Sequence, residues 1–116
     1  MSEKIETADG VLTVTDDTFA ELVLRAERPV LLDVWAEWCP PCKAISRTLA
    51  ELSVEFAGRI TVAALDADAN PATARAYRVL SMPTLLVFRD GEVVASSVGA
   101  RPKAALREFL ERHAAA

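Results

Sequence analysis

Apolar residues recur along this chain with two spacings that alternate. Short, mostly apolar runs of strand length are typical of strands buried in a sheet. They occur at residues 11–14, 30–35, 60–65, 84–88 and 92–98. Between most of these runs, apolar residues return at every third or fourth position, which is the period of a helix with one buried face. Such helices are predicted from residue 15 to about 26, from the cysteines to Gly58, over residues 70–77, and from Pro102 to about Arg112.

The order of these segments is β-α-β-α-β-α-β-β-α. Strands that alternate with helices pair in parallel, with helices on both faces of the sheet. The Asp90-Gly91 pair is a two-residue hairpin signal and predicts an antiparallel edge. Thr15 and Asp16 offer oxygens that can cap the first helix. We therefore predict an α/β fold in which four helices flank a central mixed sheet of about five strands.

The chain has 116 residues, enough for one domain, and neither a linker nor a repeat divides it. We predict that residues 11–112 form this domain. Residues 1–10 are polar and acidic, so they are predicted to be a flexible lead-in, and residues 113–116 to be a frayed tail.

The net charge of −4 and the scattered basic residues argue against binding to nucleic acid, which needs clustered Lys and Arg. The first ten residues lack the apolar core of an export signal. Apolar stretches elsewhere are far too short to span a bilayer. We therefore expect a cytoplasmic protein that is a monomer and does not contact a membrane.

The candidate chemistry lies in Trp38-Cys39-Pro40-Pro41-Cys42-Lys43, which joins a buried strand to the following helix. Free N–H groups and the dipole at a helix N-terminus stabilise a thiolate, the nucleophile of disulfide exchange. Two intervening residues let both sulfurs face each other across one turn. We expect Cys39 to be the exposed attacking thiol and Cys42 the buried resolving thiol. Pro40 and Pro41 fall at the first helical positions, where proline costs little.

Other interpretations of the cysteine pair are weaker. Half of a zinc or iron–sulfur site would need further ligands. The chain has no third cysteine, and its one histidine is His113 in the predicted tail, so a full site would require a second subunit. A merely structural pair fits poorly with the adjacent Trp38 and the two prolines. Asp33, inside an apolar strand, also points to function, because a buried carboxylate without a partner is costly.

The segment Asp33-Val34-Trp35-Ala36-Glu37-Trp38-Cys39-Pro40-Pro41-Cys42-Lys43 closely resembles the active-site segment of the thioredoxin family. So do Ser81-Met82-Pro83-Thr84-Leu85, Arg89-Asp90-Gly91-Glu92 and Val98-Gly99-Ala100. The resemblance covers residues 12–112 in order and spacing. It implies the thioredoxin fold and the reduction of disulfides in other proteins. It also implies no bound cofactor beyond a redox-active Cys39–Cys42 disulfide, and re-reduction by a flavin-containing, NADPH-dependent thioredoxin reductase.

The resemblance also assigns roles. Cys39 matches the nucleophile, Cys42 the resolving cysteine, Asp33 the carboxylate that assists proton transfer, and Pro83 a cis-proline that packs against the disulfide. From the residues alone, the Met82-Pro83 pair would be a plain turn before a strand. In the family, an apolar rim around the active site docks the substrate polypeptide, and the matching residues here are Trp38, Met82, Val98, Gly99 and Ala100. Further candidates for substrate contact are Pro40, Pro41 and Pro83.

Two of the departures from the family pattern bear on function. Pro40 replaces the usual glycine, which leaves open a more oxidising protein, such as an isomerase or a partner in cytochrome maturation. A redox-inert binding subunit is a further alternative, although it would not need both cysteines. Ala64 replaces a lysine near the buried acid, so desolvation should dominate and raise the pKa of Asp33.

Overall fold

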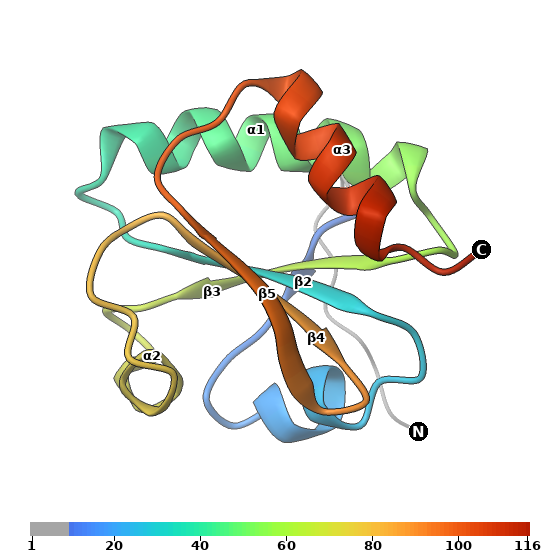
Figure 1. Ribbon diagram of the computed structural model, residues 1–116. Coiled ribbons are helices and arrows are strands. Elements are labelled where there is room, and N and C mark those ends of the chain that lie inside the picture. The colour runs from blue at the N-terminus through green and yellow to red at the C-terminus, as the bar shows by residue number, and fades with distance from the viewer. Residues whose placement is uncertain (1–9) are drawn as a thin grey trace.

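A five-stranded sheet lies at the centre of the computed structural model, which describes residues 10–116 (Figure 1). The strands are, in spatial order, β1 (Leu12–Thr13), β3 (Thr61–Asp66), β2 (Val30–Trp35), β4 (Thr84–Arg89) and β5 (Glu92–Val98). β3 pairs in parallel with β1 and β2, whereas β4 is antiparallel to β2 and β5. The predicted mixed sheet is therefore confirmed.

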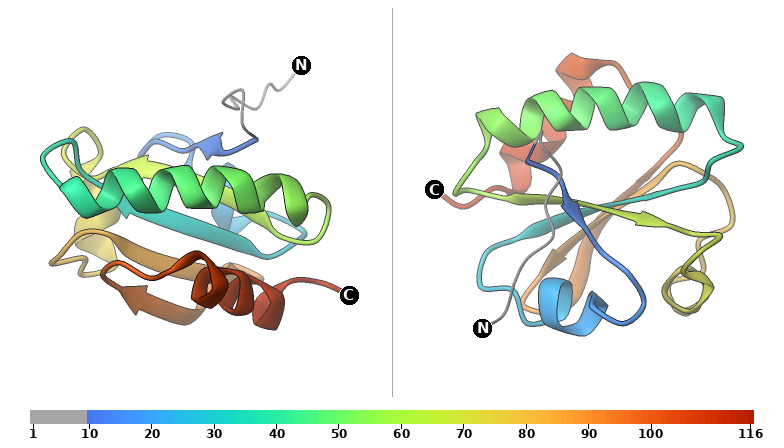
Figure 2. Two further views of the ribbon diagram at one scale, coloured as in Figure 1. Left: turned by 90° about the horizontal axis from the view of Figure 1, so that it is seen from above. Right: turned by 180° about the vertical axis from the view of Figure 1, so that it is seen from behind.

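Four helical segments cover the two faces of this sheet. They are η1 (Ala20–Leu24), a short π-helix, and the α-helices α1 (Pro40–Glu55), α2 (Pro71–Ala76) and α3 (Lys103–His113). α1 and α3 lie on one face, and η1 and α2 lie on the other (Figures 1 and 2). The hairpin between β4 and β5 turns at Asp90 (φ 52°) and Gly91 (φ 81°), both left-handed as a tight two-residue turn requires.

Alternate side chains of the central strands divide the core into two layers. On the α1 and α3 side, Leu31 of β2 packs in a buried cluster with Leu49 and Leu106. On the other side, Leu32 lies in a cluster with Phe19 and Phe88. Burial on both faces explains why β2 is almost wholly apolar, and it makes Asp33 the exception on this strand.

The first helix is shorter than the predicted segment from residue 15 to about 26, and its N-cap residue is Phe19 rather than Thr15 or Asp16. Asp16 instead caps another helix. Its carboxylate accepts hydrogen bonds from the backbone N–H groups of Ala72 (3.0 Å) and Thr73 (2.8 Å), and from the Thr73 hydroxyl (2.6 Å). These donors belong to the first turn of α2. The N-cap residue of α2 is Asn70, and its side chain makes no capping hydrogen bond. The acid stabilises free N–H groups, but on a helix distant in sequence.

The end of the chain makes hydrogen bonds with the body of the fold. α3 continues to His113, and the His113 carbonyl accepts from an Arg89 side-chain N–H at 3.0 Å. Ala115 donates its N–H to the Arg59 carbonyl at 2.9 Å and accepts from Arg59 Nε at 3.1 Å. Polar groups that would otherwise face only water therefore find partners on the body of the fold. Of the predicted lead-in at residues 1–10, all but Gly10 lies outside the described residues.

Candidate active site

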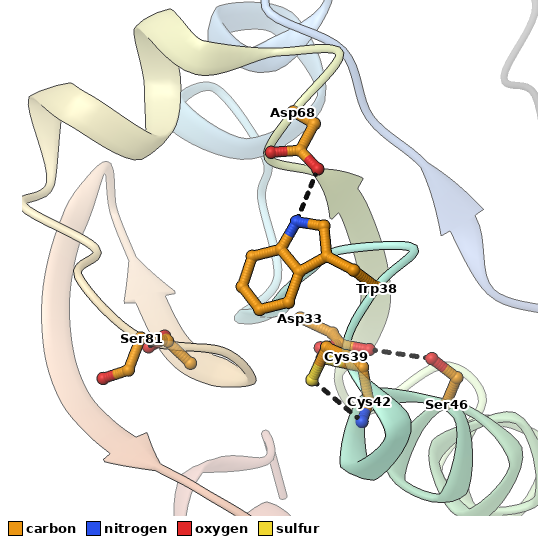
Figure 3. The surroundings of a disulfide bond; sticks show 8 residues. Asp33, Trp38, Cys39, Cys42, Ser46, Asp68 and Ser81 are labelled. Carbon is orange, nitrogen blue, oxygen red and sulfur yellow. Dashed lines mark hydrogen bonds between the residues drawn. A yellow bond between two sulfur atoms is a disulfide. The ribbon is translucent and has the colours of Figure 1, made fainter.

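The two cysteines lie where β2 ends and α1 begins, and their sulfurs form a disulfide (Figure 3). Cys39 is the N-cap residue of α1, and its Sγ accepts a hydrogen bond from the Cys42 N–H at 3.2 Å. Pro40 and Pro41 occupy the intervening positions and have no N–H. The Cys42 amide is therefore the first backbone donor of the helix, and its N–H is shared between the Cys39 sulfur and the Cys39 carbonyl, which lies 3.1 Å away.

Both cysteines are buried in this oxidised state. Cys39 is 3% exposed and Cys42 1% exposed, so the prediction of an exposed Cys39 is wrong for the disulfide form. The reason is local packing, because Ala36 joins the two cysteines in a small cluster and the side chains of Trp35 and Met82 pack against it.

Trp38 lies at the surface beside this cluster. Its side chain is 66% exposed, and its indole Nε1 donates a 2.8 Å hydrogen bond to Asp68 Oδ2 (Figure 3). Asp68 follows β3, so the hydrogen bond ties the loop before the disulfide to the loop after a neighbouring strand. Sequence reasoning missed Asp68, because an exposed acid in a polar loop carries no distinguishing pattern.

Asp33 lies on β2, behind the cysteines in the view of Figure 3, and is 2% exposed. Burial raises the pKa of its carboxyl to about 7, while a hydrogen bond from Ser46 acts in the opposite direction. This bond runs from Ser46 Oγ to Asp33 Oδ2 at 3.4 Å. Asp33 Oδ1 has no hydrogen-bond partner among residues 10–116. On β3 the residue paired with Asp33 is Ala64, which brings no charge, and the predicted rise in pKa is confirmed.

The remaining candidates lie on two loops. The Met82–Pro83 peptide bond is cis, Pro83 is buried, and Met82 reaches the cysteine cluster. The Gly99 N–H donates to the Pro83 carbonyl at 2.9 Å, so the exposed Val98 and its neighbour Gly99 lie next to this loop. Three more candidates, namely Pro40, Pro41 and Ala100, are exposed. Sequence reasoning missed Ser46. The feature that could have identified it is its polar side chain one helical turn after Cys42.

No group of three or more metal-ligating side chains occurs in residues 10–116. Each helix in this part of the chain is too short or too polar to span a membrane.

Two sulfurs that form and break a bond at the positive end of a helix can exchange electrons with another disulfide. Fold and site together thus define a thiol–disulfide oxidoreductase. Residues 10–112 match the family model described as thioredoxin. The chain is 56% identical over 98 residues to thioredoxin from Streptomyces clavuligerus, a match that covers 84% of this chain and 91% of that protein.

Other relatives agree. Identity is 50% over 101 residues to thioredoxin from Mycobacterium tuberculosis (strain ATCC 25618 / H37Rv), with 87% of each chain covered. It is 46% over 103 residues to thioredoxin C-2 of Corynebacterium nephridii, with 89% of this chain and 95% of that protein covered. The chain belongs to the thioredoxin family. It is a protein-disulfide reductase whose redox group is its own disulfide and whose substrates are proteins that contain disulfides.

Proposed function

We propose that the protein is a general reductase in which Cys39 attacks the substrate disulfide and Cys42 resolves the mixed disulfide. The observation that carries this assignment is the hydrogen bond from the Cys42 N–H to Cys39 Sγ at the helix N-terminus. The same amide and the helix dipole would stabilise a thiolate on Cys39 once the pair is reduced. Cys42 lies inside the first turn, and its Sγ accepts no such hydrogen bond from residues 10–116.

In this scheme the reduced Cys39 thiolate forms a bond to one sulfur of the substrate disulfide, and the other substrate sulfur leaves as a thiolate. Cys42 loses its proton and attacks Cys39, so the Cys39–Cys42 bond forms and the second substrate sulfur leaves. Asp33 accepts the Cys42 proton. A carboxyl with a pKa of about 7 suits this role, because it can both hold and release a proton near neutral pH.

The apolar surface around the disulfide is proposed to hold the substrate polypeptide. Trp38 and Val98 supply large exposed apolar side chains, and Met82 with Pro83 forms the loop against the cysteines. Pro40, Pro41, Gly99 and Ala100 complete the proposed surface. An apolar surface suits a reductase that accepts many substrate sequences. The free energy of apolar contacts depends on the apolar area that is buried and not on a particular geometry of polar groups.

Family membership supports a further proposal about the electron source. An NADPH-dependent, flavin-containing thioredoxin reductase would return the disulfide to the dithiol, with the protein acting as a monomer in the cytoplasm and without nucleic acid as a partner. With such an enzyme and insulin present, NADPH oxidation should require this protein. NADPH consumption that does not depend on it would contradict the proposal.

The assigned activity is tested by insulin reduction with dithiothreitol as the electron source. Catalytic amounts of the protein should accelerate reduction, and Cys39→Ser should abolish turnover. The equilibrium of the disulfide against a glutathione buffer separates a reductase from the more oxidising alternative raised by Pro40. A reductase remains largely oxidised where a more oxidising relative is already reduced.

A further inference from the structure

Ser46 lies between two hollows on the α1 side of the sheet. One hollow, of about 250 Å³, is lined by Asp33 together with Ala64, Asp66 and Ser46. The other, of about 230 Å³, is lined by Cys42 with Glu37, Lys43 and Ser46. Asp33 lines only the first hollow and Cys42 only the second, whereas Ser46 and Trp35 line both.

The sequence explains how Ser46 reaches this position. It follows Cys42 by four residues on α1, and side chains at that spacing share one face of a helix. Its neighbours on that face, Ile45 and Leu49, are buried and apolar. Ser46 therefore brings a hydroxyl to a surface of the helix that is otherwise apolar, and Figure 3 shows its side chain directed at the Asp33 carboxyl behind the cysteines.

The Ser46 hydroxyl makes the one side-chain hydrogen bond to the Asp33 carboxyl among the described residues, because Oδ1 has no partner. The 3.4 Å separation exceeds the usual range of about 2.5–3.0 Å for such bonds. A serine hydroxyl can rotate, donate and accept at once. The Ser46 hydroxyl lies between the two hollows and is held by one long hydrogen bond. It can therefore donate to the Asp33 carboxyl in the first hollow while it also faces the second hollow, which Cys42 lines.

We propose that Ser46 is a positioning residue for the resolving step, holding the Asp33 carboxylate ready to receive the proton of Cys42. In that step the Cys42 S–H bond breaks and its proton ends on the Asp33 carboxylate. The Cys42–Cys39 bond forms, and the bond from Cys39 to the substrate sulfur breaks with that sulfur taking the electron pair. Ser46 undergoes no net change. The inference rests on the proposed role of Asp33 in that reduction.

The charged groups around the two hollows do not replace this contact. Asp66 is the other acid in the Asp33 hollow, and Glu37 and Lys43 line the Cys42 hollow. Neither Lys43 nor any other cation forms an ion pair with Asp33 in residues 10–116. Loss of the Ser46 hydroxyl would therefore leave the ionised form of Asp33 without a side-chain donor, and the carboxyl would hold its proton to higher pH.

The test compares wild type with Ser46→Ala, and with Ser46→Thr, which keeps the hydroxyl. Single-turnover reduction of insulin by the pre-reduced protein is followed from pH 5.5 to 9, and the Asp33 side-chain carboxyl is titrated in parallel by carbon NMR. We expect Ser46→Ala to slow the resolving step about threefold below pH 7 and to recover above pH 8.5, since half a pH unit is a threefold change. The carboxyl titration should move upward by the same half unit, and Ser46→Thr should restore both.

A pH profile and carboxyl titration that Ser46→Ala leaves unchanged would overturn the inference, as would a loss of rate equal at all pH values. In the Asp33→Asn background, Ser46→Ala should have no further effect on the profile, and a persisting effect would show that Ser46 acts elsewhere. Failure of the proposed reductase scheme looks different. In that case wild type itself would not reduce insulin, while the carboxyl titration would still report on the contact between Ser46 and Asp33.

Discussion

Asp33 lies on a strand whose other side chains are almost all apolar, and its pKa is raised to about 7 because burial removes its water. In the unfolded chain the same carboxyl would have its ordinary pKa of 3.8. Between these two pH values the folded state holds a proton that the unfolded state has lost. Folding is therefore favoured by this group at low pH, and the contribution disappears as the pH rises through about 7.

Asp33→Asn should remove this pH dependence. We expect the variant to exceed wild type in free energy of unfolding by roughly 2–4 kcal/mol at pH 8, and by much less at pH 4.5. Urea melts at the two pH values measure the difference, with Asp17→Asn at an exposed position as the control. A variant less stable than wild type at pH 8 would mean that Asp33 is a satisfied structural carboxylate.

The two tryptophans should report the redox state differently. Trp35 packs against the cysteine cluster, whereas Trp38 is exposed and directs its Nε1 to Asp68. Because a disulfide in contact with an indole quenches its emission, we expect fluorescence to rise on reduction. Trp35→Phe should abolish most of that rise and Trp38→Phe should keep it. The reverse pattern would assign the quenched indole to Trp38.

At the scale of elements, α2 depends on a residue far away in sequence. Asp16 lies before η1, yet its carboxylate accepts three hydrogen bonds from Ala72 and Thr73 in the first turn of α2. The hydrogen bond from the Thr73 hydroxyl is the largest cause of the lowered pKa of Asp16, and the two backbone N–H groups add to it. With α2 at six residues, a cap supplied from outside matters more than it would for a long helix.

Asp16→Ala should therefore lower the free energy of unfolding by about 1 kcal/mol at pH 7, the usual cost of losing a helix cap. Since the pKa of Asp16 in the folded state is below its ordinary value of 3.8, the effect should be present in full above that pH and should vanish as the pH falls through the lowered pKa. Denaturant melts at pH 7 and pH 2.5 measure it, with Asp17→Ala beside it as the matched control. Equal losses at both pH values would assign the effect to something other than the carboxylate.

Over the whole molecule, the sequence predicts best where a pattern has one physical cause. Buried strands such as Val30–Trp35, the hairpin at Asp90-Gly91 and the helix that starts at the cysteines all follow from local periodicity or turn chemistry. In the same way, a single acidic residue within an apolar strand identified Asp33 as a candidate functional residue. Its raised pKa follows from burial alone.

Features set by tertiary contacts could not be predicted in that way. The Asp16 cap, the Trp38–Asp68 hydrogen bond and the Ala115 contact each join residues distant in sequence, and no local pattern encodes the partner. Burial of Cys39 has the same origin, because the side chain of Met82 packs against the cysteine cluster from another loop.

The central claim, that Cys39 attacks and Cys42 resolves, is tested most directly by trapping the mixed disulfide. Each single variant, Cys39→Ser and Cys42→Ser, is reduced, incubated with a disulfide-containing protein such as insulin, quenched with acid and analysed by mass spectrometry. We expect a stable adduct through Cys39 in the Cys42→Ser protein and almost none in the Cys39→Ser protein. An adduct that forms through Cys42 in the Cys39→Ser protein, with none through Cys39, would contradict this claim.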